Sequence, residues 1–177
     1  MKKVIETQRL LFRELMPSDA EVMFELDSDP AVVLYTGDKP LTHIDQARQR
    51  IDSVMQQYED FGIGRWAAVL KETNEFIGWA GLKYIKELNS RQDNYDLGYR
   101  LLKRHWGKGY GTESAKAFVS YGFDVMKLLR ISAYIDVDHV ASAKILDKCG
   151  LKFTNTFMDE GDLCAWYEIV NSPSDCS

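Results

Sequence analysis

The residues between positions 103 and 112 combine glycine and positive charge in a way that suits an anion. Three cations and three glycines gather there: Lys103, Arg104, Gly107, Lys108, Gly109 and Gly111. Glycine lets the backbone approach a ligand closely and adopt a positive φ. A helix is expected to begin at about Thr112, and a helix start presents free N–H groups and a positive dipole end. Together these features predict a pyrophosphate cradle, although the glycines would also suit a tight strand-to-helix turn.

Two other phosphate-binding motifs are excluded by the spacing. A P-loop has serine or threonine after its lysine, whereas Lys108 is followed by Gly109. A Rossmann fingerprint that began at Gly107 would need a third glycine where Thr112 stands. Rossmann folds also open with this motif, whereas here the loop lies in mid-chain after an expected hairpin. The loop therefore belongs to a different class of anion site.

A few titratable side chains lie close to this loop in the sequence. Asp96 stands two residues before Gly98 on the strand that leads into the loop, where it could be a general base or a solvated strand-edge carboxylate. Glu113 falls in the first turn of the next helix, where a carboxylate complements the helix dipole. His105 beside the loop is expected at the surface, and His43 begins a helix with a solvated role or one at the rim of a substrate site.

The elements that must position these residues are indicated by hydrophobic periodicity. Strands are expected over residues 7–14, 65–70, 76–85, 95–102, 131–137, 151–157 and 163–170, and helices near 18–26, 42–58, 112–126 and 140–148. This order predicts a mixed α/β fold with antiparallel strands early and one β-loop-α-β crossover in the middle. Capping boxes are expected at Ser18 with Glu21, and in the same way at Thr42 with Asp45.

Length and composition indicate one ordinary globular domain. The chain has 177 residues, of which 45% are hydrophobic and 28% charged, with a net charge of −5. We expect a single domain over residues 1–177, with its core at about 6–170 and a frayed tail at 172–177. The acidic balance argues against nucleic acid as a partner, and no apolar run reaches the roughly 18 residues of a membrane span. The three cysteines lack metal-ligand spacing, so we expect no metal, and they favour a reducing cytoplasm. Charged and polar residues among the first nine positions argue against a signal peptide.

The glycine loop resembles a known family. It matches the R/Q-x-x-G-x-G/A signature of the GNAT superfamily of acetyl-CoA-dependent N-acetyltransferases at Arg104-His105-Trp106-Gly107-Lys108-Gly109. The wider string from Leu97 to Glu113 is similar to the RimJ/RimL branch, which acetylates ribosomal-protein N-termini and many small amines. Three further segments resemble that branch: Thr7–Arg13, Phe76–Gly78 and Ala141–Leu151. The resemblance covers roughly residues 6–170.

The resemblance implies both a fold and an activity. The fold would be a single GNAT-like α/β domain, with a twisted, mixed and mostly antiparallel sheet of about seven strands and about four flanking helices. The activity would be transfer of an acetyl group from acetyl-CoA to a primary amine, on a peptide N-terminus or a small molecule, by direct attack on the thioester. The enzyme would be a cytoplasmic monomer or homodimer with no nucleic-acid or membrane partner.

The resemblance also implies site residues. Those expected to bind acetyl-CoA are Leu101, Leu102, Arg104, His105, Gly107, Lys108, Gly109, Gly111, Thr112, His139 and Ser142. Those expected to bind the amine are Tyr35, Trp79 and Asp96, although Tyr35 and Trp79 would also suit a packed core. Asp96 would be the base and Ser142 the acid, although Ser142 would equally suit a helix cap.

The chain departs from the family pattern at two positions. His139 replaces an asparagine that contacts the cofactor arm, and Leu146 replaces a tyrosine that protonates the leaving thiolate. These departures keep an alternative open, in which the chain is a catalytically silent acyl-CoA-binding module.

Overall fold

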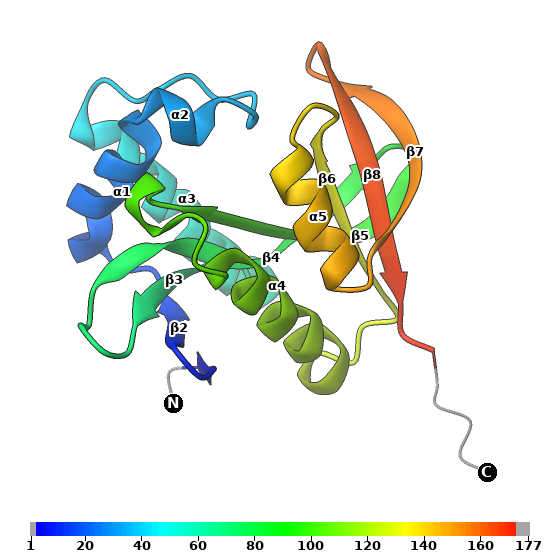
Figure 1. Cartoon of the computed structure of the whole chain (residues 1–177), viewed down its shortest axis with the longest axis horizontal. Coiled ribbons are helices and arrows are strands. Elements are labelled where there is room, and N and C mark those ends of the chain that lie inside the picture. The colour runs from blue at the N-terminus through cyan, green and yellow to red at the C-terminus, as the bar shows by residue number, and fades with distance from the viewer. Residues whose placement is uncertain (1–2, 173–177) are drawn as a thin grey trace.

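The computed structural model describes residues 3–172, and it is built around one twisted eight-stranded sheet (Figure 1). The strands lie in the order β1-β2-β3-β4-β5-β6-β8-β7. Their bounds are β1 Val4–Glu6, β2 Leu10–Glu14, β3 Arg65–Leu70, β4 Phe76–Leu88, β5 Arg91–Leu101, β6 Arg130–Asp136, β7 Lys152–Asp159 and β8 Asp162–Val170. Every neighbouring pair is antiparallel except β5 and β6, which are parallel.

Helices cover both faces of the sheet. Their bounds are α1 Ala20–Ser28, α2 Pro30–Val33, α3 Ile44–Phe61, α4 Tyr110–Ser120 and α5 Val140–Lys148, with 3₁₀ turns η1 at Pro17–Asp19 and η2 at Lys103–His105. One buried cluster joins α4 and α5 to the sheet through residues such as Phe118 and Leu146. A second joins α1 and α3 to the opposite face through residues such as Met23 and Ile51. The sheet therefore has an apolar layer on each face, one beneath α4 and α5 and the other beneath α1 and α3.

The predicted fold class is confirmed, with small differences in the element counts. Over residues 3–172 the sheet has eight strands rather than about seven, and five α-helices flank it rather than about four. The additional elements are β1 and α2, of three and four residues, which are too short to show a hydrophobic period. Within residues 3–172, no helix is long and apolar enough to cross a membrane. Most of the tail expected at 172–177 lies outside the described residues.

The predicted helix starts are wrong in detail. Ser18 lies inside η1, and the carboxylate that organises this entry is Asp19, which accepts the Met16 N–H and pairs with Arg13. At α3 the cap is His43 rather than Thr42: His43 Nδ1 accepts the Asp45 N–H, and the Gln46 side chain completes a capping box. Tertiary partners and one-residue shifts decide which polar side chain caps a helix, and the sequence pattern does not resolve them.

The β4–β5 hairpin and the helix after the glycine loop also differ from expectation. The two strands extend to a two-residue turn at Asn89 and Ser90, both with positive φ, a conformation that suits a tight hairpin. Helix α4 begins two residues early, at Tyr110, and changes to a wider π-helical turn over Tyr121–Val125. The glycine loop thus passes directly into the helix with no spacer.

Candidate functional site

The glycine loop leaves a row of backbone N–H groups uncommitted at the start of α4. Gly107 and Gly109 have φ values of +71° and +82°, in the left-handed region that favours glycine. Gly109 is the N-cap of α4 and offers no side chain to satisfy the first turn. The first helical bond runs from Glu113 N–H to the Gly109 carbonyl at 3.0 Å. The preceding N–H groups of Tyr110, Gly111 and Thr112 therefore remain available for an anion.

Part of the predicted cradle is already committed to local turns. The His105 N–H donates to Leu102 at 2.9 Å, and the Trp106 N–H donates to Lys103 at 3.1 Å. Leu101 and Leu102 are buried; the Leu101 carbonyl accepts the Trp106 indole N–H, and the Leu102 N–H donates to Ile77. The open part of the cradle therefore runs from Gly107 to Thr112 and includes Lys108.

The side chains of Arg104 and His105 point to carboxylates on neighbouring elements. Arg104 pairs with Glu25 and, at 3.0 Å, with Glu75. The expectation that His105 lies at the surface is wrong: it is 6% exposed, and its Nε2 lies 3.1 Å from the same Glu75 carboxylate. The hydrogen bond with His105, and then the one with Arg104, hold the pKa of Glu75 below its usual value. These contacts fix η2 against the β3–β4 turn, so both side chains position the loop.

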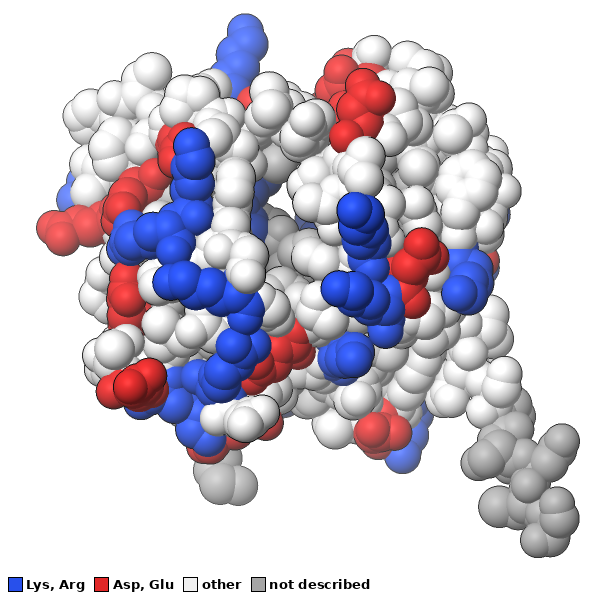
Figure 2. Space-filling view, in the orientation of Figure 1, with Lys and Arg blue, Asp and Glu red and all other residues white. Residues whose placement is uncertain are grey.

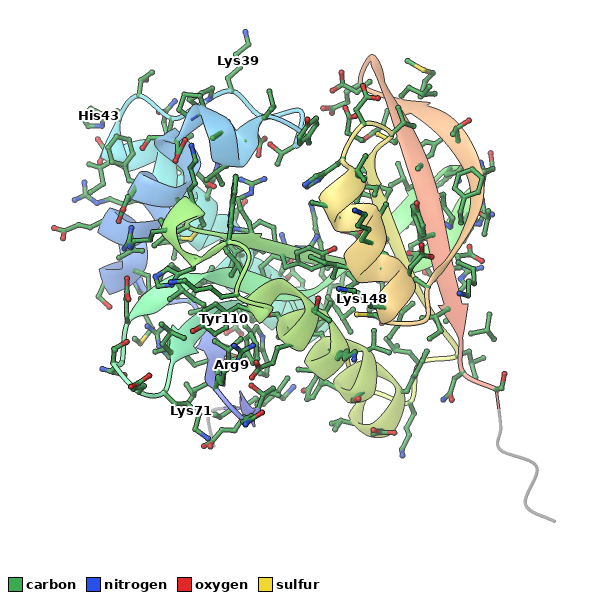
Figure 3. All side chains as sticks on the ribbon, viewed as in Figure 1. Arg9, Lys39, His43, Lys71, Tyr110 and Lys148 are labelled. Carbon is green, nitrogen blue, oxygen red and sulfur yellow. The ribbon has the colours of Figure 1, made fainter. Side chains whose placement is uncertain are left out.

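The N-terminal residues brace the loop from its other side. Arg9 donates to the Lys108 carbonyl at 2.9 Å and to Glu113 at 2.7 Å, and its guanidinium lies 4.4 Å from the centre of the Tyr110 ring (Figure 3). Thr7 donates to Glu113 at 2.6 Å. Although burial alone would raise the pKa of Glu113, these hydrogen bonds lower it below its usual value. Sequence analysis gave Arg9 no role, because the pairing joins residues about a hundred positions apart.

Figure 2 shows a hollow in the surface between two halves of the molecule, one that holds α1, α2 and α3 and one that holds α5, β7 and β8. Lys and Arg atoms lie on both borders of the hollow. Exposed lysines on α4 and α5 are Lys116, Lys144 and Lys148, of which Lys148 is labelled in Figure 3. The chain as a whole is acidic, so this is a local concentration of positive charge suited to a multiply phosphorylated ligand.

The sheet splays open between β5 and β6. These strands share one register pair, Asp96 with Ser132. Beyond it, the residues of β5 from Leu97 to Leu101 pair with β4 alone. The Tyr134 N–H donates to the Asp96 carboxylate at 3.3 Å rather than to the β5 backbone. An unpaired strand edge next to a phosphate cradle can bind an extended ligand by strand-like hydrogen bonds.

Asp96 lies buried at the closed end of this splay. It is 5% exposed and pairs with Arg65, whose guanidinium also donates to the carbonyls of Gly81 and Asp96. Burial raises the pKa of Asp96 above its ordinary value, although Arg65 opposes the shift. A Cβ on Gly98 would lie 2.7 Å from the Arg65 guanidinium, so glycine is needed there for Arg65 to reach Asp96.

Helix α5 forms the opposite wall of the splay. Ser142 is 5% exposed, and its Oγ lies 2.8 Å from the phenolic oxygen of Tyr99 on β5. His139 precedes the helix and stacks on Tyr35, with ring centroids 4.8 Å apart. Burial holds the pKa of His139 below its usual value, although Asp136 opposes this. Leu146 is buried in the core between α5 and the sheet.

A polar groove of about 660 Å³ lies on the other face of the sheet, between α3 and the central strands. Trp79 lines it, with the guanidinium groups of Arg65 and Arg100 5.2 and 5.1 Å from its ring centre. Asp96 lies beneath Arg65, whereas Tyr35 lies at the His139 stack and is not among the groove residues. Of the three residues expected to bind the amine, the structure thus places Trp79 in the wall of the groove, Asp96 behind the groove residue Arg65, and Tyr35 at the contact with His139.

Sequence analysis missed a charged network in the same groove. Arg50 and Arg100 both pair with Asp27, which is 1% exposed, and both also pair with Asp38. Tyr134 also lines the groove, and burial raises its pKa. No local motif marks the charged network, because its residues come from α1, α3, β5 and the loop between α2 and α3. His43 lies at the outer edge of the molecule and caps α3 (Figure 3).

Comparison with known proteins identifies the type of domain. The family model described as Acetyltransferase (GNAT) domain matches residues 9–152. The chain is 33% identical over 145 residues to the uncharacterized N-acetyltransferase p20 of Bacillus licheniformis, covering 82% of this chain and 80% of that protein. A GNAT-family acetyltransferase structure from Bacillus anthracis superposes with a TM-score of 0.81 at 24% identity, covering 95% of this chain and 98% of that one. A RimL ribosomal L7/L12 alpha-N-protein acetyltransferase in complex with coenzyme A gives 0.78 at 16% identity, covering 95% and 98%.

Proposed function

Because this chain belongs to the GNAT acetyltransferase family, we propose that it transfers the acetyl group of acetyl-CoA to a primary amine with a low pKa. The single observation that carries the proposal is the geometry of the glycine loop. Uncommitted N–H groups from Gly107 to Thr112 follow the end of β5, and the edge of β5 that faces β6 is unpaired beyond Asp96.

The residues present fit acetyl-CoA. Gly107 and Gly109 leave the cradle without side chains where phosphate oxygens would approach, and Lys108 adds charge. The free edge of β5 beyond Asp96 offers backbone groups to the amides of the pantetheine arm. Backbone N–H groups of this edge would also hold the thioester oxygen as it gains negative charge.

Acetyl-CoA supplies an activated acetyl group: the amine nitrogen forms a bond to the thioester carbon as the carbon–sulfur bond breaks. We assign the role of general base to Asp96 and that of hydrogen-bond donor to the leaving thiolate to Ser142. Asp96 takes the proton that the amine loses, and burial makes its carboxylate more basic than an exposed one. Both oxygens already accept hydrogen bonds, but each carboxylate oxygen has a further lone pair. Ser142 donates a hydrogen bond to the departing thiolate.

The acceptor enters from the groove lined by Trp79 and Arg100, on the face opposite α4 and α5. It must be neutral to attack. At pH 7, deprotonating a lysine side chain costs about 4.6 kcal/mol, whereas an α-amine costs about 1–1.4 kcal/mol. The site offers one buried carboxylate as a base, and Leu146 stands where the family pattern has a tyrosine acid. With so few groups for proton transfer, the α-amine is the favoured acceptor. The acceptor is therefore a peptide N-terminus or a small-molecule amine of similar pKa.

Two measurements test this function. Thiol release from acetyl-CoA against a panel of amines, peptides and aminoacyl compounds should show turnover with some acceptors. Binding of acetyl-CoA without thiol release in any case would favour the silent binding module instead. Mass spectrometry of a matched peptide pair then decides the amine class: one peptide has a free N-terminus and no lysine, the other a blocked N-terminus and an internal lysine. Acetylation confined to the lysine peptide would overturn the α-amine assignment.

A further inference from the structure

A buried phenol, which the proposed function does not use, joins the two walls of the splay. Tyr99 on β5 lies 2.8 Å from the Ser142 Oγ and 3.3 Å from the Ser142 carbonyl oxygen. Within residues 3–172, these contacts are the hydrogen bonds that join β5 to α5. Tyr99 also packs near the start of α4, since a Cβ on Gly111 would lie 3.9 Å from its ring. The pair is thus held from three elements.

The length of coenzyme A places its sulfur near this pair. About twelve covalent bonds separate the pyrophosphate oxygen from the sulfur, the length of about four residues of extended chain, or about 13–14 Å. The phosphate cradle at Gly107–Thr112 is separated from β5 by η2, and the unpaired edge of the strand runs from Leu101 back to Leu97. A pantetheine arm that lies along this edge from its cradle end covers about four residues, from Leu101 back to Gly98. Its sulfur end therefore lies within a residue or so of Tyr99, between that strand and α5.

The phenol controls where the serine hydroxyl points. A serine hydroxyl rotates freely and, in the first turns of a helix, tends to bond a nearby backbone carbonyl. It has one proton to donate and two lone pairs. The phenol lies 2.8 Å from the Ser142 Oγ, and either oxygen can donate in this contact. When the phenol donates, the serine proton points away from Tyr99 and is free for another acceptor.

We propose that Tyr99 is a positioning residue that orients the Ser142 hydroxyl toward the sulfur of coenzyme A, so that the two side chains stabilise the thiolate as a unit. The inference rests on the proposed function. The inference extends that function to a tyrosine on β5, whereas the family pattern has its tyrosine at the position of Leu146. The start of α5, where Ser142 lies, adds the positive end of a helix dipole to the same place.

The first test titrates the thiol of bound coenzyme A by the ultraviolet absorbance of its thiolate, and it needs no acceptor. Ser142→Ala and Tyr99→Phe should each raise the thiol pKa by about one to two pH units, the effect of one hydrogen bond to a charged acceptor. The double variant should raise it no further. Tyr95→Phe is the matched control, because Tyr95 lies on the same face of β5, and it should leave the thiol pKa at the wild-type value.

The second test uses any acceptor found in the amine panel. Both single variants should lower kcat by about the same factor, with the KM for acetyl-CoA nearly unchanged, and their effects should not multiply in the double variant. Melting temperatures measured in parallel identify a variant that has lost its fold, and the remaining single variant then decides. A Tyr99→Phe protein with wild-type thiol pKa and kcat would overturn the proposal, as would multiplicative effects. Because the thiol titration requires coenzyme A alone, it also decides the proposal if no amine is acetylated.

Discussion

Replacing Gly109 tests the phosphate cradle most directly. At a φ of +82°, a β-branched residue pays about 1–2 kcal/mol of backbone strain, and its Cβ would lie 3.3 Å from the Arg9 guanidinium. Gly109→Val should therefore lower the melting temperature of the free protein by about 2–8 °C for a chain of this size. It should also displace at least one N–H group from the phosphate. Loss of one charge-assisted hydrogen bond costs about 1.5–3 kcal/mol, which weakens binding about ten- to hundredfold.

The assay compares thermal stability with and without acetyl-CoA at a fixed concentration. At 100 times the wild-type dissociation constant, the ligand should stabilise the wild type by about 2.7 kcal/mol, or about 5–11 °C. For Gly109→Val the stabilisation should fall to about 0.4–1.4 kcal/mol. A calorimetric titration should show the same loss as a higher dissociation constant.

A matched control separates strain from loss of the cradle. Gly161 has a φ of +97° in the turn between β7 and β8, and a Cβ there meets nothing within 4 Å. Gly161→Val should pay similar backbone strain while leaving the dissociation constant for acetyl-CoA unchanged. The cradle assignment is refuted if Gly109→Val binds acetyl-CoA as well as the wild type, or if Gly161→Val weakens binding equally.

Three further perturbations test Asp96, His139 and the buried thiol of Cys164 on β8. Asp96→Asn should lower kcat by about 10²–10⁴-fold with little change in cofactor affinity, and an undiminished kcat would transfer the role of base to another group. Because the pKa of folded His139 lies below its unfolded value, its contribution to stability is present above the unfolded pKa and lost as pH falls through the folded pKa. His139→Phe should therefore lose less stability than the wild type between pH 7 and pH 5, and equal losses in urea titrations would contradict this. Burial raises the pKa of Cys164 to about 11, so iodoacetamide should alkylate it about a hundredfold more slowly in folded than in unfolded protein at pH 8, as followed by peptide mass mapping.

Local features of the sequence were sufficient to predict the fold class and the glycine loop. Strand and helix periods depend on residues close in the chain, so the central strands and the helix after the loop were found. The positive φ values of Gly107 and Gly109 are likewise a local requirement that glycine alone meets without strain. The helix caps were less secure, because Ser18, Asp19, Thr42 and His43 are all chemically able to cap.

The remainder of the site depends on contacts between distant positions. Tyr99 meets Ser142 across 43 positions, Arg65 meets Asp96 across 31, and Arg100 meets Asp27 across 73. No periodicity or spacing encodes such pairs, because they arise from strand order and from the face of the sheet that each side chain occupies. The sequence by itself predicted an anion site where a strand passes into a helix. Only the tertiary structure decided which side chains lie beside this loop, since burial and long-range pairing exist only once the sheet has formed.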